Sequence, residues 1–231
     1  MVEQAEPVTE FVSQVGDEEL VRQRRAQIVA AAVRLFSEQG YYRTKVQEVA
    51  KRAGVSAGLI YQYVRDKEDL LLLSILDVLD SYSAEIPRAV GHISDPLARC
   101  IAAFRTYCRV VDQRRDATIL AYRSTKSLPP SRRTIIKRAE RQTNQLIAGY
   151  IQTCIDLGLF RPVDPELATY QLVMYAHAWA LKYWQFAKRF DLETYIEHGL
   201  DLFLHALLTE RGRELLDRSA SVRGTATSSV S

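Results

Sequence analysis

Apolar residues recur along most of this chain at the period of an α-helix. Residues 20–39, for example, place apolar side chains at positions i, i+4, i+7 and i+8 between Ile28 and Phe36. No stretch alternates apolar and polar residues for long enough to predict a strand. The pattern therefore predicts an all-α protein, with helices at residues 20–39, 46–53, 57–63, 67–85, 96–112, 116–126, 132–157, 165–188 and 192–210.

Residues that begin or end helices lie between these segments. Gly40, Gly54 and Gly158 each follow a predicted helix, where a positive φ angle closes the last turn. Pro87 is expected to stop the helix that begins at residue 67. The expected N-caps are Thr44, Ser56, Asp66 and Asp164, with Asp69 in a capping-box position and Pro165 as the first helical residue after its cap.

The lengths of the helices divide the chain into parts. A module of short helices at residues 20–66 precedes a module of long helices at residues 67–211, with no flexible linker between them. Residues 1–19 form an acidic N-terminal extension. Residues 212–231 form a tail rich in small and polar residues, which is expected to be disordered.

The net charge of +3 is unevenly distributed along the chain. Residues 1–20 contain six acids and no base, whereas residues 21–67 contain ten bases and three acids. A basic module at one end of a chain indicates an anionic partner. A solvated helical surface has the same composition, so charge alone leaves both interpretations open.

Several classes of protein are disfavoured by composition and motifs. No run of about 18 apolar residues is present, so no membrane span is predicted. The acidic start of the chain lacks the apolar segment of a secretory signal. The three cysteines have no metal-ligand spacing, and reduced thiols are expected. Because no phosphate loop, metal-spaced ligand set or nucleophile elbow is found, we expect a cytoplasmic protein without catalytic residues, metal or cofactor.

Residues 46–63 read VQEVAKRAGVSAGLIYQY and predict a helix-turn-helix. Ala50 is small where the two helices cross, and Gly54 permits the turn between them. Val49 and Ile60 are expected to face inward and fix the crossing angle. The second helix is too short to be stable alone, but a helix that places only its first residues in a major groove needs no greater length. A tight turn between two helices of a bundle is the other interpretation.

The residues around this motif resemble the TetR family of one-component transcriptional regulators. The resemblance covers RRAQIVAAAVRLFSEQGYYRTKVQEVAKRAGVSAGLIYQYVRDKEDLL, including the Phe-x-x-x-Gly-Tyr end of the first helix and the KEDLL segment. The later stretch LGLFRPVDPELA resembles the family's turn before its eighth helix. Val64 departs from the family pattern, which usually has Phe at this core position.

This resemblance implies a homodimer whose two recognition helices enter successive major grooves of a near-palindromic double-stranded DNA operator. Thr44 and Lys67, at helix N-termini, are expected to contact phosphates. The hydroxyls of Tyr61 and Tyr63 have the same expected role, with packing in the core as the alternative. The expected DNA-binding residues are Arg43, Thr44, Lys45, Ser56, Ala57, Gly58, Tyr61, Gln62, Tyr63 and Lys67, with Gln62 reading adenine through its amide.

The resemblance also implies that the long-helix module binds a small effector and forms the dimer interface with its last two helices. Large apolar residues near the end of the chain fit such an interface. The interface candidates are Tyr170, Trp184, Phe203 and Leu207, with burial in their own domain as the alternative. The candidates for an apolar effector pocket, with an ordinary core as the alternative for each, are Phe104, Tyr107, Cys108, Tyr122, Leu146, Tyr150, Met174 and His177.

A basic run in residues 122–141 resembles the corresponding segment of TetR-type regulators of fatty-acid and acyl-CoA metabolism. An acyl-CoA joins an apolar chain to a polyphosphate, so an apolar pocket beside a basic rim suits it. A solvated face is the competing interpretation. The basic residues of the run are Arg123, Lys126, Arg132, Arg133, Lys137, Arg138 and Arg141.

The sequence thus favours a ligand-responsive DNA-binding repressor that an apolar effector, such as an acyl-CoA or fatty acid, releases from its operator. Two DNA-binding alternatives stay open: an architectural protein without an effector, and an activator. An all-α enzyme is less favoured, because no catalytic constellation is found.

Overall fold

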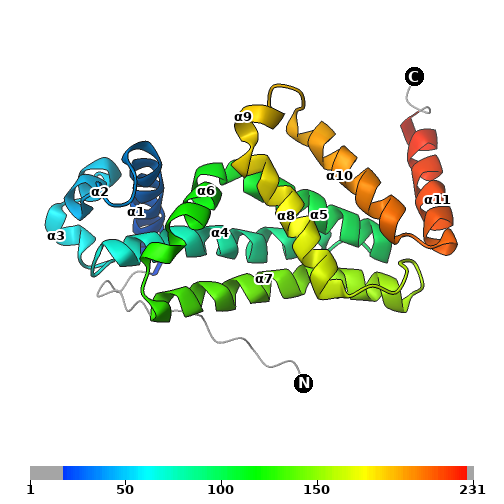
Figure 1. Ribbon diagram of the computed structural model, residues 1–231, viewed down its shortest axis with the longest axis horizontal. Helices are drawn as coiled ribbons and strands as arrows, with labels where there is room; N and C mark the ends of the chain where they lie inside the picture. The colour runs from blue at the N-terminus through cyan, green and yellow to red at the C-terminus, as the bar shows by residue number, and fades with distance from the viewer. Residues whose placement is uncertain (1–17, 228–231) are drawn as a thin grey trace. The chain divides into compact units, whose positions relative to one another are not determined.

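The structure is a computed structural model and describes residues 18–227 of the chain. The helices are α1 (Glu18–Gln39), α2 (Val46–Ala53), α3 (Ala57–Ile60), α4 (Lys67–Val90), α5 (Pro96–Gln113), α6 (Arg115–Ser124), the 3₁₀ helix η1 (Thr125–Ser127), α7 (Pro130–Asp156), α8 (Pro165–Leu181), α9 (Tyr183–Phe186), α10 (Leu192–Leu207) and α11 (Glu210–Thr227) (Figure 1). One isolated antiparallel bridge pairs Phe160 with Leu208. The expected all-α fold class is confirmed. The acidic segment up to residue 17 lies outside the described residues.

None of the helices within residues 18–227 is both long and apolar enough to cross a membrane.

The described residues divide into two compact units. The first contains residues 18–81 and 114–141, and the second contains residues 82–113 and 142–227. α4 and α7 therefore each contribute residues to both units. This division differs from the expected boundary after residue 66, because α6 packs against α1. Such packing joins segments distant in sequence, and local periodicity carries no signal for it.

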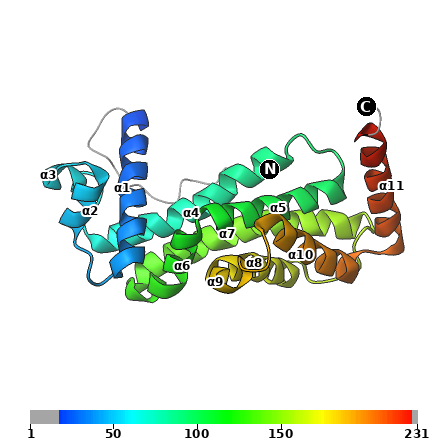
Figure 2. The same cartoon turned by 90° about the horizontal axis from the view of Figure 1, so that it is seen from above.

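The core of the first unit forms between α1, α2, α3, the start of α4 and α6. Both views show α2 and α3 beside α1 (Figures 1 and 2). Ile28, Val49, Ile60 and Leu70 have no exposed area in this core. Full burial of one such side chain contributes roughly 1.5–3 kcal/mol. Because α3 has only four residues, this packing stabilises it rather than its own hydrogen bonds.

In the second unit, α8 packs against both α5 and α10 through polar as well as apolar contacts. Trp179 Nε1 on α8 donates a hydrogen bond to Asp112 Oδ1 on α5 at 2.8 Å. The hydroxyls of Tyr175 and Tyr195 donate to each other's backbone carbonyl at 2.6 and 2.7 Å, and their rings stack with centroids 4.5 Å apart. Gly199 on α10 lies directly against this pair, since a Cβ there would be 2.4 Å from Cε1 of Tyr175.

Two helix boundaries differ from the sequence prediction. α4 continues through Pro87 to Val90. Proline's fixed φ angle suits a helix, and in the last turn its missing N–H removes only one hydrogen bond. The segment expected as one helix at 165–188 breaks at Lys182, where φ is −120° and ψ is 21°. Neither glycine nor proline marks this break, so the sequence offered no signal for it.

The predicted recognition helix and the predicted tail also end differently. α3 ends at Ile60 and continues as a turn rather than reaching residue 63. Residues 210–227, of which 212–227 were expected to be disordered, form α11. Thr209 Oγ1 accepts a hydrogen bond from the N–H of Gly212 at 3.1 Å and so caps the new helix. Arg218 pairs with Glu214 one turn before it at 3.7 Å.

The close contact at Gly199 generates a stability prediction. Gly199→Ala should destabilise the protein by about 1–3 kcal/mol, because the added methyl group overpacks the stacked Tyr175 ring. Thermal unfolding followed by circular dichroism measures the effect. The control is Gly149→Ala in α7, where a Cβ meets no atom within 4 Å; this change should be neutral or stabilising. Equal melting temperatures for the two variants would contradict the prediction.

Candidate functional site

Local capping interactions build the helix-turn-helix formed by α2 and α3. The N–H of Lys45, the N-cap of α2, donates to Glu48 Oε2 at 2.9 Å. This hydrogen bond holds the pKa of Glu48 below its ordinary value. Gly54 ends α2 with a φ of 70°, as its sequence position predicted. Ser56 then caps α3, since its Oγ accepts from the N–H of Leu59 at 3.0 Å, which confirms the predicted cap.

The prediction of Thr44 as the N-cap of α2 is wrong, because Lys45 occupies that position. Thr44 is 1% exposed, and its hydroxyl donates to the carbonyl of Gly40 at 2.9 Å. The side chain therefore fastens the loop between α1 and α2 to the end of α1. A buried hydroxyl with this partner has no free surface for a phosphate, so only the loop's backbone remains for the expected contact.

The residues of α3 and the turn after it separate into a buried and an exposed set. Ile60, Tyr63 and Val64 are at most 5% exposed and pack in the core of the first unit. Tyr63 thus takes the core role that the sequence left open. The expected DNA-contacting residues that are exposed are Arg43, Lys45, Ser56, Ala57, Gly58, Tyr61 and Gln62. At Gly58 a Cβ would meet no atom within 4 Å, which leaves this part of α3 open to a close partner.

Lys67, the first residue of α4, is anchored to the loop between α1 and α2. Its Nζ donates to the carbonyl of Tyr42 at 3.0 Å and lies 4.7 Å from the centre of the Tyr41 ring. An ammonium group has three N–H donors, so this arrangement leaves others for a phosphate. The predicted contact at Lys67 remains compatible with its position.

Two residues near the exposed candidates for DNA contact, Tyr42 and Gln47, were not themselves among the expected DNA-binding residues. Tyr42 is 78% exposed, and its hydroxyl shares a hydrogen bond with Ser127 Oγ of η1 at 2.8 Å. Gln47 is exposed in the first turn of α2, and its Nε2 donates to the hydroxyl of Tyr61 at 3.4 Å. The signal available for Gln47 was its position in the first turn of the first helix of the motif. No sequence signal pairs Tyr42 with Ser127, since 85 positions separate them.

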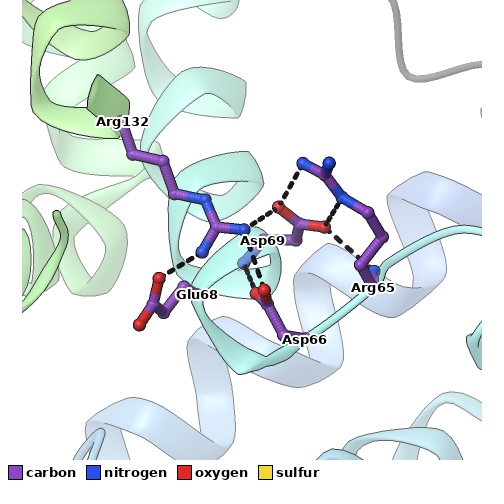
Figure 3. A network of polar contacts seen from close by, with 5 residues as sticks. All are labelled: Arg65, Asp66, Glu68, Asp69 and Arg132. Carbon is purple, nitrogen blue, oxygen red and sulfur yellow. Dashed lines mark hydrogen bonds and ion pairs between the residues drawn. The ribbon is translucent and has the colours of Figure 1, made fainter.

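An ion-pair network surrounds the N-terminus of α4 (Figure 3). Asp66 caps α4, as predicted, by accepting from the N–H of Asp69 at 2.7 Å. Asp69 accepts from the N–H of Arg65 at 2.9 Å and from the Arg65 Nε at 3.0 Å, so it binds the residue before the cap rather than the cap itself. Arg132 of α7 donates to Asp66 at 2.8 Å and to Asp69 at 2.7 Å, and it also pairs with Glu68.

The electrostatics of this network differ from the expectation for the basic run. Arg132 is only 13% exposed, and three carboxylates surround it, so it is not available as part of a basic rim for a polyphosphate. Burial opposes ionisation of Asp66, but the hydrogen bonds from Arg132 and from the Asp69 N–H outweigh it and lower the pKa of Asp66. The exposed members of the run are Arg123, Lys126, Lys137, Arg138 and Arg141.

Half of the expected effector residues lie on α5 and α8 in the second unit. Phe104, Tyr107 and Cys108 of α5 are buried, and Tyr107 stacks on Tyr82 of α4 with ring centroids 4.1 Å apart. The Tyr107 hydroxyl shares a hydrogen bond with His177 Nε2 of α8 at 3.0 Å. Burial lowers the pKa of His177 to about 4. The imidazole is therefore neutral at pH 7 and able to accept or donate one hydrogen bond.

The other expected effector residues are placed differently. Leu146 and Tyr150 of α7 are half-buried in the second unit. Tyr122 lies on α6 in the first unit and is 46% exposed. Met174 of α8 is 48% exposed. It shares the outer face of α8 with Tyr170 and with Leu167, which is 60% exposed, at spacings of i, i+3 and i+7. Met174 therefore belongs to a surface stripe rather than to the interior.

The expected dimer residues also divide into two sets. Trp184 is 65% exposed on α9 and Tyr170 is half-buried on α8. Phe203 instead packs edge-on against Phe104 and Tyr175, and Leu207 is buried. The outward position on α10 is Leu202, at 64% exposure. Phe203 and Leu207 therefore pack within their own unit, the alternative that the sequence left open, and Leu202 is the exposed large apolar residue of α10.

Comparison with known proteins assigns the chain to a family. Residues 28–73 match the profile of bacterial regulatory proteins of the tetR family, and residues 94–185 match the tetracyclin repressor-like C-terminal domain. The chain is 51% identical over 201 residues to the HTH-type transcriptional regulator HbdR of Aromatoleum sp. (strain CIB), which covers 87% of this chain and 88% of that protein. The chain belongs to the TetR family of transcriptional regulators. Members of this family act as DNA-binding regulators, and the resemblance predicted from the sequence is confirmed.

Solved structures of TetR-family proteins share the fold. A tetR-family regulatory protein from Rhodococcus RHA1 superposes with a TM-score of 0.71 at 23% identity, over 81% of this chain and 99% of that one. AibR, solved in complex with isovaleryl coenzyme A and operator DNA, superposes with a TM-score of 0.66 at 22% identity, over 78% of this chain and 97% of that one. At these identities the likeness establishes the fold alone.

The buried His177 generates a pH prediction. Because its pKa is near 6.5 when unfolded and about 4 when folded, the unfolded chain binds an extra proton between these values. Stability should therefore be full above pH 6.5 and fall by up to about 3 kcal/mol as the pH decreases to 4. His177→Gln should lose less stability over this range than the wild type, measured by urea unfolding at each pH. The control His198→Gln, at an exposed histidine, should follow the wild type; the same behaviour in His177→Gln would contradict the assignment.

Proposed function

We propose that this TetR-family protein is a cytoplasmic, ligand-responsive repressor that binds a near-palindromic DNA operator as a homodimer. The observation that carries the proposal is the division of α3 and its following turn into a buried anchoring set and an exposed set. Ala57, Gly58, Tyr61 and Gln62 form the exposed set, and Ile60 is fully buried. This is the arrangement that a short helix needs if it is held rigidly while its outer side enters a major groove.

The chemistry of the exposed set supports DNA as the partner. Gln62 is able to pair bidentately with adenine, while the small residues Ala57 and Gly58 permit close approach. Arg43, Lys45 and Lys67 supply positive charge beside α3 for phosphates. Gln47 and Tyr42 extend this surface. Gln47 donates a hydrogen bond to the Tyr61 hydroxyl, and Tyr42 is exposed and precedes Arg43 in the sequence.

Exposed large apolar side chains support the homodimer. Leu167, Met174, Trp184 and Leu202 of α8, α9 and α10 are each 48–65% exposed. Leu167 and Met174 share one face of α8, and exposed apolar surface of this kind favours a protein interface. Two helices from each copy make a four-helix bundle, the arrangement that this family resemblance implied. Trp184 and Tyr170 keep their proposed roles, and Leu202 replaces Phe203 and Leu207.

We place the effector in the second unit, in the region of Phe104, Tyr107, Cys108, Tyr150 and His177, and propose an acyl-CoA or related acyl compound. The buried aromatic side chains of Phe104 and Tyr107 and the polar pair of Tyr107 with His177 suit an acyl group with a thioester carbonyl, to which the Tyr107 hydroxyl is able to donate. The complex of AibR with isovaleryl coenzyme A supplies a precedent within the same fold.

Selection of bound DNA from a random library, with and without a panel of acyl-CoAs, tests the function. Recovery of an inverted repeat that acyl-CoAs release is the expected result. An inverted repeat released by none of them, with thermal stabilisation by aromatic or drug-like compounds instead, would reject the acyl-CoA effector. Binding without any sequence preference would favour an architectural protein and reject the repressor.

Base reading by Gln62 is tested on the selected operator. Gln62→Ala should lower the affinity for the operator by about 1–3 kcal/mol per contacted adenine and leave binding to random DNA unchanged. Fluorescence anisotropy with both DNAs at one salt concentration measures this. Gln145→Ala, at an exposed glutamine of α7, is the control. Parallel loss on both DNAs would show that Gln62 does not read bases.

The proposed dimer interface is tested at Leu202, an exposed side chain of α10. Leu202→Glu should shift the protein from dimer to monomer in sedimentation experiments, because two copies cannot bury this charge without a partner. Leu157→Glu changes a side chain that is 42% exposed at the end of α7 and should leave the dimer intact. A Leu202→Glu protein that is still dimeric would place the interface elsewhere.

A further inference from the structure

The N-terminus of α4 presents an electrostatic conflict within the proposed DNA-binding surface. Lys67 is proposed to contact a phosphate there, and a helix N-terminus attracts anions. Yet Asp66, Glu68 and Asp69 flank Lys67 on both sides in the sequence. These carboxylates stabilise the start of α4 because they satisfy its dipole and its free N–H groups. The same charges repel the DNA backbone.

Arg132 of α7 resolves this conflict in the structure. Figure 3 shows its guanidinium directed at all three carboxylates from the side of α7, with Arg65 on the opposite side of Asp69. Arg65 pairs with Asp69, and Arg132 pairs with Asp69, Asp66 and Glu68. Residues 65–69 contain two bases and three acids, so the addition of Arg132 brings the group to neutrality.

The position of Arg132 in its own helix indicates that its role lies in this contact. It is the third residue of α7, whose first turn contains no acid. A cation in the first turn of a helix is unfavourable for that helix. The stabilisation that Arg132 provides therefore comes from its ion pairs with the carboxylates of α4 and its N-cap. A second contact fastens the same segment, since Ser127 of η1 shares a hydrogen bond with Tyr42, whose carbonyl accepts from Lys67.

We propose that Arg132 sets operator affinity without touching DNA, by neutralising Asp66, Glu68 and Asp69, and that withdrawal of Arg132 is a step in operator release. This rests on the proposed DNA-binding function. α7 is one continuous helix whose residues after Arg141 belong to the second unit, where the effector is proposed to bind. A shift of α7 along or about its axis withdraws the guanidinium and exposes the carboxylates beside Lys67. One movement thus changes both the anchoring of α4 and the charge that DNA meets.

Charge-matched variants of the full-length protein test this on the selected operator. Arg132→Met should weaken operator binding roughly tenfold at low salt, and the deficit should shrink as salt increases, because it arises from charge. Arg133→Met, next to it in α7, removes the same formal charge away from the network and should bind like the wild type. Circular dichroism and thermal unfolding verify that each variant is folded.

A rescue variant separates charge neutralisation from mechanical fastening. The triple variant Arg132→Met with Asp66→Asn and Glu68→Gln removes two of the carboxylates and keeps a good N-cap at position 66. It should recover operator affinity although the connection between α7 and α4 stays broken. Failure to recover, or unchanged binding by Arg132→Met, would overturn the proposal.

Two further outcomes are distinguishable. If Arg132→Met does not fold, the double variant Asp66→Asn with Glu68→Gln in the wild-type background decides: its affinity should exceed that of the wild type, and equal or weaker binding would overturn the proposal. If the wild type itself selects no DNA sequence, the proposed function fails at that step, before any variant is compared.

Discussion

α3, the proposed recognition helix, has four residues and no stability of its own, so the rest of the first unit must hold it. Ile60 is fully buried in the core of the first unit, and Ser56 caps α3 by accepting from the N–H of Leu59. Every side chain used to anchor it is lost for contact with DNA. Tyr63 and Val64 therefore pack inward, and the outer surface is reduced to a few small and polar residues. The same burial fixes the angle at which these residues are presented.

The second constraint is electrostatic and acts where α4 begins. Acidic side chains are the best stabilisers of a helix N-terminus, but a DNA-binding surface requires that same N-terminus to tolerate phosphates. The chain keeps the acids and brings a compensating guanidinium from α7. Burial raises the pKa of Asp66, but the hydrogen bonds from Arg132 and from the Asp69 N–H outweigh burial and lower it. In the role that we propose for Arg132, the stability of α4 and the affinity for DNA are linked through this one side chain.

Local sequence signals predicted the parts of this structure that depend on local physics. Turn chemistry predicted the positive φ of the glycines at positions 40, 54 and 158. It also predicted the helix caps at Ser56, Asp66 and Asp164. The helical period predicted that Val49 and Ile60 face inward. The errors occur where tertiary contacts decide. Thr44 bonds to Gly40 rather than capping α2. Helical period also does not predict that Phe203 packs against Tyr175 while Leu202 beside it is exposed. Arg132 donates hydrogen bonds to Asp66 and Asp69, more than 60 positions earlier in the chain, and helical periodicity does not predict such contacts.

The extent of the first unit bears on which substitutions alter a regulator of this kind during evolution. The family profile for the DNA-binding part ends at residue 73, whereas the compact unit also takes in residues 114–141. Arg132, which we propose sets the charge of the DNA-binding surface, therefore lies in the segment that also leads into the proposed effector-binding part. In this proposal a substitution near the start of α7 alters operator affinity while the helix-turn-helix itself stays unchanged. The proposed coupling of response and recognition rests on chain connectivity, because α7 carries Arg132 at one end and belongs to the second unit at the other.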